Sequence, residues 1–169
     1  MAMSPIYAQR SGFAPEAIAL FVAAAVFGGL LLQAPIGWLS DLRDRRLVLC
    51  WMSVLASATA LAGMLLGGSD IGATIAILAF GGLTFPYYSV AIAHVNDRVE
   101  PAQRVAASGA MILLFGLGSV AGPAATSAAM ETAGPAGFFG LLAVVTGLYA
   151  LYVLYRLALA RPSAAGEAA

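Results

Sequence analysis

The sequence predicts an all-α fold, a polytopic membrane helix bundle with about five transmembrane helices. Hydrophobic residues make up 62% of its 169 positions and charged residues only 9%. A soluble domain of this length cannot bury so much apolar surface, so much of that surface must face lipid. The charged residues gather in short clusters between apolar stretches that can each cross a hydrocarbon core of about 30 Å. These clusters mark the helix ends.

The first two predicted helices form a hairpin. The first spans residues 15–40, because Pro15 suits an early helical position and Glu16 is favourable in a first turn. Residues 41–46 are too highly charged to enter the bilayer and too few to form a domain. A second helix must therefore return, over residues 47–66.

The third predicted helix spans residues 72–94 and should be bent. It contains the pair Gly81 and Gly82 and, further on, Pro86, which removes a backbone donor from the helix interior. We expect these residues to produce a kink or a close contact with a neighbouring helix.

Two more helices complete the predicted bundle. The fourth spans residues 103–130, where Gly118 and Gly122 lie four positions apart and so share one face, on which a neighbouring helix can pack closely. Pro123 should bend the outer end of this helix. The fifth spans residues 137–160 and ends in tyrosines typical of a membrane interface.

The arginines predict the orientation. Residues 1–14 contain Arg10 and should be extracytoplasmic, whereas the other arginines fall on the opposite side, which should be cytoplasmic. We expect a multi-pass protein of the bacterial plasma (inner) membrane, with its N-terminus outside and residues 161–169 as a disordered cytoplasmic tail. A start on the outer side with an odd number of crossings is typical of a fragment or partial repeat. The arginines on the predicted cytoplasmic side are Arg43, Arg45, Arg46, Arg98, Arg104, Arg156 and Arg161.

Composition and spacing argue against catalysis and cofactors. No Asp, Glu, Lys, Arg or His lies deep in a predicted helix, and the sequence shows neither a nucleophile paired with a base nor ligands at a metal-binding spacing. Cys50 is the single cysteine, which excludes an internal disulfide. Zero net charge leaves no basic field for nucleic acid. We expect no enzyme activity, metal, cofactor or nucleic-acid partner; the lipid bilayer is the partner that the composition requires.

Polar side chains within the apolar helices are candidates for lining a solute cavity. Gln33 costs on the order of 1–3 kcal/mol in apolar surroundings unless it finds partners, so it either faces a polar cavity or bonds across helices. Thr84, Tyr87, Tyr88 and Ser89 lie beside the expected break in the third helix, which could offer freed carbonyls and two phenols to a solute. A structural kink with interfacial tyrosines explains the same pattern, and both interpretations stay open.

The charged turn of the first hairpin, GWLSDLRDRR, resembles the cytoplasmic signature of the major facilitator superfamily of transporters. The signature positions are matched by Gly37, Asp41, Arg45 and Arg46. The basic residue that usually follows the aspartate is displaced by one position, to Arg43, and Asp44 stands where a glycine is usual.

The resemblance implies both a fold and a function. The signature follows the second helix of each six-helix half in that family, so the chain would be a partial repeat that lacks the first helix of the C-terminal half. It would belong to a secondary transporter of a small solute, efflux included, with the missing N-terminal half as partner. Asp41 and its neighbouring arginines would form a conformational latch, because the signature aspartate meets a helix N-terminus of the other half in one conformation.

A second class of function is also compatible with the sequence. The chain could be a non-transporting membrane subunit or regulator that binds partner helices through small-residue faces, at Gly28 and Gly29 or at Gly118 and Gly122. A stable complex with an unrelated membrane protein would favour this alternative.

Overall fold

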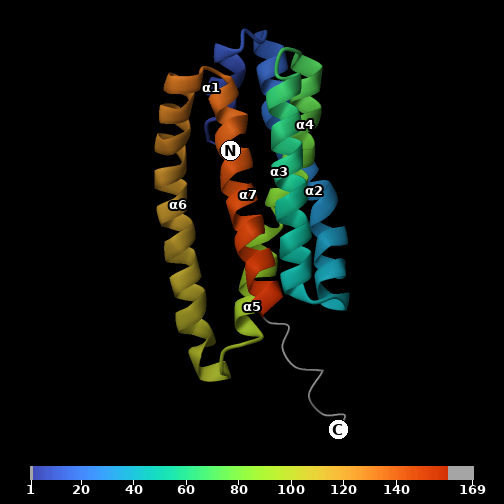
Figure 1. The fold of residues 1–169 in the computed structure, drawn as a ribbon, viewed down its shortest axis with the longest axis vertical. Coiled ribbons are helices and arrows are strands. Elements are labelled where there is room, and N and C mark those ends of the chain that lie inside the picture. Colours follow the sequence, from blue (N-terminus) through green and yellow to red (C-terminus); the bar gives the residue numbers. More distant parts are fainter. Residues whose placement is uncertain (1, 160–169) are drawn as a thin grey trace.

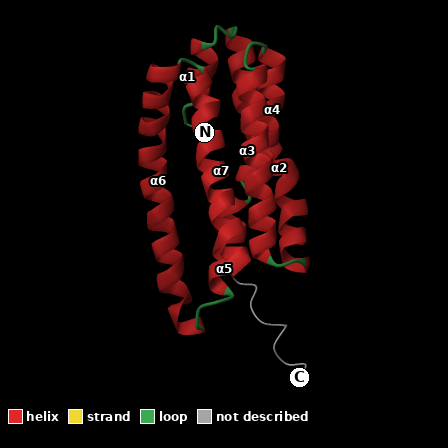
Figure 2. Ribbon diagram, in the orientation of Figure 1, coloured by secondary structure: helices red, strands yellow, loops and turns green. Residues whose placement is uncertain are grey.

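The computed structural model describes residues 2–159, which are helical apart from short connections and contain no strand (Figure 2). Its helices are α1 (Ser4–Arg10), α2 (Pro15–Leu42), α3 (Arg45–Leu66), α4 (Asp70–Thr84), α5 (Tyr87–Asn96), the 3-10 turn η1 (Pro101–Gln103), α6 (Arg104–Ala133) and α7 (Ala136–Leu159). In this described part, 5 segments are long and apolar enough to cross a membrane. The predicted fold class, an all-α membrane bundle, is thus confirmed. The predicted tail at residues 161–169 lies outside the described residues.

The first hairpin has a very short connection. Helix α2 continues to Leu42, and α3 begins at Arg45, so that only Arg43 and Asp44 join them. The Asp44 carboxylate accepts a hydrogen bond of 2.9 Å from the backbone N–H of Arg46 and thereby caps α3. This tight turn fixes the charged residues at the shared end of the two helices.

The third membrane segment is divided into two helices. Helix α4 ends at Thr84, and Pro86 is the N-cap of α5. Proline has no backbone N–H, so no hydrogen bond can run from residue 86 to the carbonyl one turn earlier, and the helical ladder is interrupted there. Both pieces contact α2 and α3, and α5 also contacts α6.

The long helices pack in a row, α2 against α4, α4 against α3, α3 against α7 and α7 against α6 (Figure 1). Helices α2 and α4 meet at glycines. A Cβ atom added at Gly28 would lie 1.9 Å from the carbonyl oxygen of Leu78, and one added at Gly81 would lie 2.1 Å from that of Ala25. The two backbones are therefore in direct contact, as small residues allow in membrane helix pairs.

The short helix α1 is packed into the bundle at the end opposite the charged turn. Tyr7 is only 2% exposed, and its ring lies 4.9 Å from that of Phe138 and 5.4 Å from that of Phe21, between centroids. Phe13 and Phe139 complete this aromatic cluster. Burial raises the pKa of the Tyr7 phenol, because the charged form loses hydration. Residues 4–13 thus tie α2 to α7.

Helix α6 stands apart from the other helices (Figure 1). Its most apolar stretch has 0% of its residues buried, whereas the corresponding stretch of α3 has 44% buried. Met130, near the C-terminal end of α6, is buried, and the contacts of α6 are with α7 and, more sparsely, with α5. A long apolar helix with so little burial needs lipid or another helix around it.

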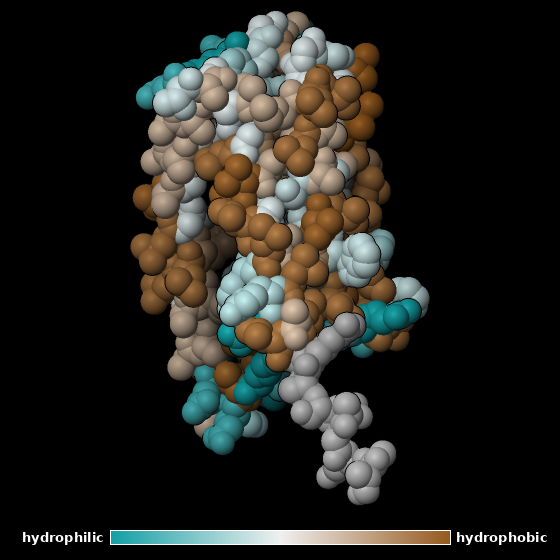
Figure 3. Space-filling model, in the orientation of Figure 1, coloured by the Kyte–Doolittle hydropathy of each residue, from teal (hydrophilic) through white to brown (hydrophobic). Residues whose placement is uncertain are grey.

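The outer surface has the distribution expected in a bilayer. Figure 3 shows apolar side chains along the length of the helices and hydrophilic side chains gathered toward the two ends. Large apolar side chains such as Leu65, Ile71 and Val105 are more than 70% exposed. Contact with the hydrocarbon of a lipid bilayer accounts for this exposure.

Candidate functional site

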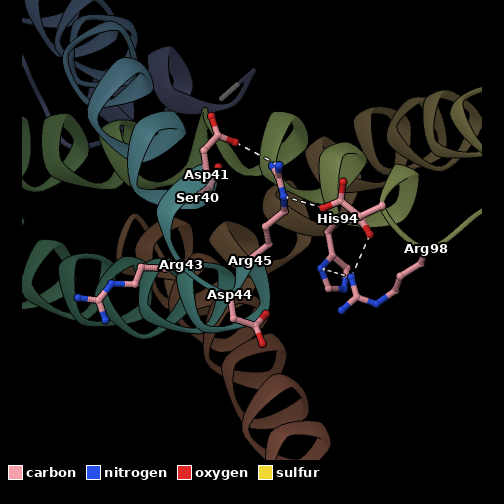
Figure 4. Close-up of a pocket in the computed structure, with 8 residues that line it drawn as sticks. Ser40, Asp41, Arg43, Asp44, Arg45, His94 and Arg98 are labelled. Carbon is pink, nitrogen blue, oxygen red and sulfur yellow. Dashed lines mark hydrogen bonds and ion pairs between the residues drawn. The ribbon is translucent and has the colours of Figure 1, made fainter.

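The candidate site is a charged cluster where α2 ends, α3 begins and α5 ends (Figure 4). Eight residues line an open depression of about 450 Å³ there: Ser40, Asp41, Arg43, Asp44, Arg45, His94, Asp97 and Arg98. Its carboxylates are balanced in number by its arginines, with three of each. The depression therefore offers no net field that would select an anion or a cation, and its geometry points to ion pairing within the protein.

Arg45 is the centre of this cluster. Its Nε atom lies 2.8 Å from Oδ2 of Asp97, and its terminal nitrogen lies 3.1 Å from Oδ1 of Asp41. The Arg45 side chain is 22% exposed, against 69% for Asp41 and 55% for Asp97. One guanidinium thus joins the ends of three helices, because its planar fork can serve two carboxylates at once.

His94 and Arg98 form a second contact in the cluster. A terminal nitrogen of Arg98 donates to Nδ1 of His94 at 2.8 Å and to the His94 carbonyl oxygen at 3.1 Å. A guanidinium can only donate, so Nδ1 of this imidazole is the acceptor and Nε2 carries the proton. Arg98 thus satisfies a backbone carbonyl in the last turn of α5.

The other residues of the predicted signature have different roles. Arg43 points away from the cluster (Figure 4), and the side chains of Arg43 and Arg46 make no ion pair with any residue of the described chain. Gly37 has no atom within 4 Å of an added Cβ, and its carbonyl oxygen accepts a 2.8 Å hydrogen bond from Ser40 Oγ. Arg45 and Asp41 are thus the members of the signature that the fold brings together.

The residues predicted to line a cavity do not gather in one place. The Tyr87 hydroxyl turns toward α3, where it is hydrogen-bonded to Ser53 Oγ and lies 3.4 Å from the Leu49 carbonyl oxygen. Tyr88 instead faces α6, with its ring 5.5 Å from that of Phe115 in an edge-on arrangement. The Tyr87 ring also lies 5.9 Å from that of Tyr149 on α7, so the two adjacent tyrosines connect α5 to three other helices.

The remaining cavity candidates make few contacts. Gln33 and Ser89 are exposed on α2 and α5. Thr84 is half-buried, and its hydroxyl donates to the Phe80 carbonyl oxygen at 2.8 Å within its own helix. Such back-bonding satisfies a hydroxyl without a solute.

The predicted packing and kink residues fall into two groups. Gly81 and Gly82 lie against α2, and Pro86 separates α4 from α5. Gly118 and Gly122 have open space around them, with no atom of the described chain within 4 Å of an added Cβ. Helix α6 continues as one helix through Pro123.

Sequence reasoning did not single out Asp97 and Ser53. Asp97 directly follows the last residue of α5 and pairs with Arg45 of the basic turn. Its acidic side chain would indicate this pairing only to a reader who already knew that the end of α5 lies beside that turn. Ser53 is 0% exposed in the middle of α3, and its neighbours in the sequence give no sign of the tyrosine that meets it.

The chain matches the family model of the Major Facilitator Superfamily over residues 1–169. Its relatives include an uncharacterized MFS-type transporter of Enterobacter sp., 32% identical over 152 residues, and the uncharacterized MFS-type transporter YcaD of Escherichia coli K12 and of Salmonella arizonae, 31% and 30% identical over 155 residues. The alignment covers 90% of this chain and 39% of each relative, so the chain spans about two fifths of their length. No solved structure gives a significant match.

Proposed function

Since the chain belongs to the major facilitator superfamily, we propose that it forms part of the C-terminal half of a secondary transporter for a small solute. The observation that carries this proposal is the family match along the whole chain, with the signature residues Asp41 and Arg45 paired at a helix junction. Alternating access in such transporters requires two repeats that rock about a central site. The N-terminal half would come from the part of the relatives that this chain does not cover.

The charged cluster supports a latch between the two halves. Asp41 is 69% exposed while still paired with Arg45, so one face of its carboxylate is free for a helix N-terminus of the other half. Arg45 holds Asp41 in place and links it to Asp97. In this proposal the residues 37–46 set the conformational equilibrium and do not bind the solute.

The solute path in this proposal runs along α2, α5 and α6. Gln33 and Ser89 are exposed polar groups on two of these helices, and Tyr88 and Phe115 bridge α5 to α6. Thr84 and Tyr87 contribute to helix contacts. The described residues contain no group of three or more His, Cys, Asp or Glu that could hold a metal ion, and we propose transport without enzyme activity or cofactor.

The orientation follows from the arginines. We propose that the end with the charged cluster faces the cytoplasm of a bacterium and that α1 lies at the outer face of the inner membrane. Arg43, Arg45, Arg98 and Arg104 lie at or beside one end of the bundle, and Arg10 ends α1 at the other. The N-terminus is then outside and the C-terminus inside.

One observation favours the alternative, a non-transporting subunit or regulator. Gly118 and Gly122 leave room on α6 for a helix of another protein. Gly28 and Gly29 do not, because α4 and the ring of Phe85 already occupy the space beside them. The alternative would therefore use the α6 face alone.

An epitope tag at the chromosomal 3′ end of the gene tests the proposal. Membranes of the native cells are immunoblotted before and after membrane-permeant cross-linking. We expect either a product well above 17.2 kDa, or a 17.2 kDa product cross-linked to a second protein of the same family. A stable 17.2 kDa product cross-linked only to an unrelated membrane protein would overturn the transporter proposal in favour of the subunit.

A further inference from the structure

A second depression lies at the end of the bundle opposite the charged cluster, where α3 and α6 end and α7 begins. Nine residues line about 380 Å³ there, and we call it the α6–α7 groove. Beside it the backbones of α6 and α7 are in contact, because a Cβ atom added at Gly137 would lie 2.1 Å from the Ala129 carbonyl oxygen. Further along, the two helices stand apart (Figure 1), and the most apolar stretch of α6 has 0% of its residues buried. The groove thus lies where α6 diverges from α7.

The lining of the α6–α7 groove is apolar. It comes from small residues of α6 and α7 and from the longer side chains of Met64, Leu141 and Val144. Thr132 is its one polar side chain, and the Thr132 hydroxyl already bonds at 3.1 Å to backbone carbonyl oxygens of its own helix. Among the described residues, no charged side chain lines the groove. An apolar site of this kind stays dry and favours an apolar occupant, as a cavity of about 150 Å³ lined by apolar side chains does with benzene.

The groove is elongated along α7. Its lining on that helix runs from Ala136, the first residue of α7, to Val144, which corresponds to about 12 Å of helix axis. Because α7 is long and apolar enough to span a membrane, the groove starts near the membrane surface and extends into the hydrocarbon core. Met64 and Val144 on its rim are 47% and 57% exposed, so the groove opens to the surroundings of the bundle. A hydrocarbon chain that descends from a lipid headgroup has this direction and can enter it.

The groove is too small for a helix of another protein. One helical turn, about 10 Å across and 5.4 Å tall, occupies roughly 400 Å³, so a single turn would already exceed the space. Stable interfaces between proteins bury about 1,200–2,000 Å². Nine side chains, of which five are alanine or glycine, do not provide such an area. A single hydrocarbon chain is much narrower than a helix and fits.

We propose that the α6–α7 groove is a binding site for one acyl chain of a phospholipid, which stays there longer than the lipids that only surround the bundle. The chain leaves other hydrocarbon when it enters, so its affinity comes from close packing against the groove walls. It fills the space between two helices that diverge, and so supports α6, which has few contacts with the rest of the bundle. The inference involves neither a solute nor the other half of a transporter, so it stands or falls apart from the proposed function.

Gly140 offers a way to fill the groove with a side chain. A Cβ atom there would lie 3.9 Å from the Met64 sulfur, which is an ordinary contact, so Gly140→Leu places a branched side chain in the space without displacing backbone. The matched control is Gly116→Leu on α6, which lies outside the groove and where an added Cβ meets no atom of the described chain within 4 Å. Both variants exchange glycine for leucine within a helix, so their effects on helix propensity are the same.

The full chain and its variants are purified in detergent, and their unfolding midpoints are measured with and without added palmitoyl-oleoyl phosphatidylethanolamine. A ligand that binds only the folded state raises the midpoint. We expect the lipid to raise the midpoint of the parent and of Gly116→Leu by several degrees and that of Gly140→Leu much less. Native mass spectrometry should show a one-lipid adduct that is severalfold more abundant in the parent and Gly116→Leu than in Gly140→Leu. Glycerophosphoethanolamine, the headgroup without acyl chains, should change none of the midpoints.

Equal stabilisation and equal adducts in the three proteins would overturn the proposal, because the lipid would then act on the whole surface. An equal effect of the headgroup alone would overturn it as well. If Gly140→Leu does not fold, Val144→Phe closes the groove from its rim and is compared with Val145→Phe. Both valines are 57% exposed, and of the two only Val144 lines the groove. The lipid effect should then fall in Val144→Phe and persist in Val145→Phe, and the same response in both would decide against the site.

Discussion

Arg45 differs from the other arginines of its turn in what its side chain touches. It is mostly buried and pairs with two carboxylates, whereas Arg43 is exposed and points away from the other charged side chains (Figure 4). Pairs that are this exposed contribute about 0–1 kcal/mol each, so the role of Arg45 depends on joining three helices more than on any one pair.

Replacing Arg45 should therefore cost more than replacing Arg43. We expect Arg45→Ala to lower the free energy of unfolding by about 0.5–2 kcal/mol, because it leaves Asp41 and Asp97 facing each other without a cation. Arg43→Ala should change it by less than about 0.5 kcal/mol. Thermal unfolding of the two variants in one detergent, followed by circular dichroism, measures the difference. An equal loss in both would show that the ion pairs contribute nothing.

Some glycines of this bundle lie at helix contacts and others do not. Gly28 lies where α2 touches the α4 backbone, and a methyl group there would overlap the Leu78 carbonyl oxygen at 1.9 Å. We expect Gly28→Ala to push the helices apart and destabilise the protein by about 1–3 kcal/mol. Gly37→Ala on the same helix meets no atom within 4 Å and should be neutral or stabilising, since alanine favours helix. The unfolding midpoints of the Gly28→Ala and Gly37→Ala variants test this expectation. Similar midpoints would contradict the close contact between α2 and α4 at Gly28.

The helix α1 is predicted to depend on its single buried tyrosine. Tyr7→Ala empties the centre of the aromatic cluster and should undock α1. Ala8 is 0% exposed, so Ala8→Cys in a Cys50→Ala background should react slowly with a maleimide and much faster once Tyr7 is replaced. Tyr155→Ala, at a side chain that is 62% exposed, serves as the control and should leave the labelling rate unchanged. Fast labelling in all three proteins would mean that α1 is not docked, and slow labelling in all three would mean that its docking does not depend on Tyr7.

The sequence could predict some of these elements and not others, for physical reasons. Runs of about 20 apolar residues have no stable place outside a bilayer, so composition alone indicated the long helices. The seven residues of α1 carry no such signal, because their burial depends on Phe138 and Phe139, far along the chain. The missing N–H of proline predicted a break near Pro86. The directions of the side chains beside the break depend on the folded backbone, so the sequence did not predict them.

The same distinction applies to the candidate site. Asp41 lies in the last turn of α2 and Arg45 begins α3, so the short charged turn that the sequence predicted is what brings the two side chains together. Tyr87 and Ser53 are 34 positions apart, and their contact exists only because α5 crosses α3 at that level. The predicted cavity role of Tyr87 came from its position beside the break; in the fold its hydroxyl meets a serine of α3.

At the scale of the molecule, the proposed orientation can be tested with single cysteines. In a Cys50→Ala background, Gln9→Cys should react with a membrane-impermeant maleimide added to spheroplasts, whereas Glu100→Cys should react only after lysis. Both side chains are exposed in the structure, so access across the membrane determines the outcome. The reverse pattern would place the arginine-rich end outside. It would contradict the proposal that the latch meets the other half of the transporter at the cytoplasmic face.

Helix α6 leaves one side of the molecule, called its open side here, without a packed neighbour. The glycines of α6 indicate where a helix of another protein would lie. With 3.6 residues per turn, Gly118 and Gly122 fall on the side of α6 that carries Phe115, which meets α5, and the buried Thr126. Gly109 falls on the opposite side of α6, about half a turn from Gly118 and about four tenths of a turn from Gly122. All three have open space around an added Cβ, so a larger side chain at any of them costs this chain nothing in its own packing.

If the other half of the transporter contributes a helix to that space, its assembly should depend on which glycine is filled. We expect Gly118→Leu and Gly122→Leu to leave the unfolding midpoint of this chain unchanged but to reduce cross-linking to the other half severalfold, because close helix approach needs small residues there. Gly109→Leu should reduce cross-linking much less. Equal cross-linking in all three variants would show that the space beside Gly118 and Gly122 is filled by lipid. The open side of α6 would then be an outer surface of the transporter, and the partner half would have to meet the bundle along α2.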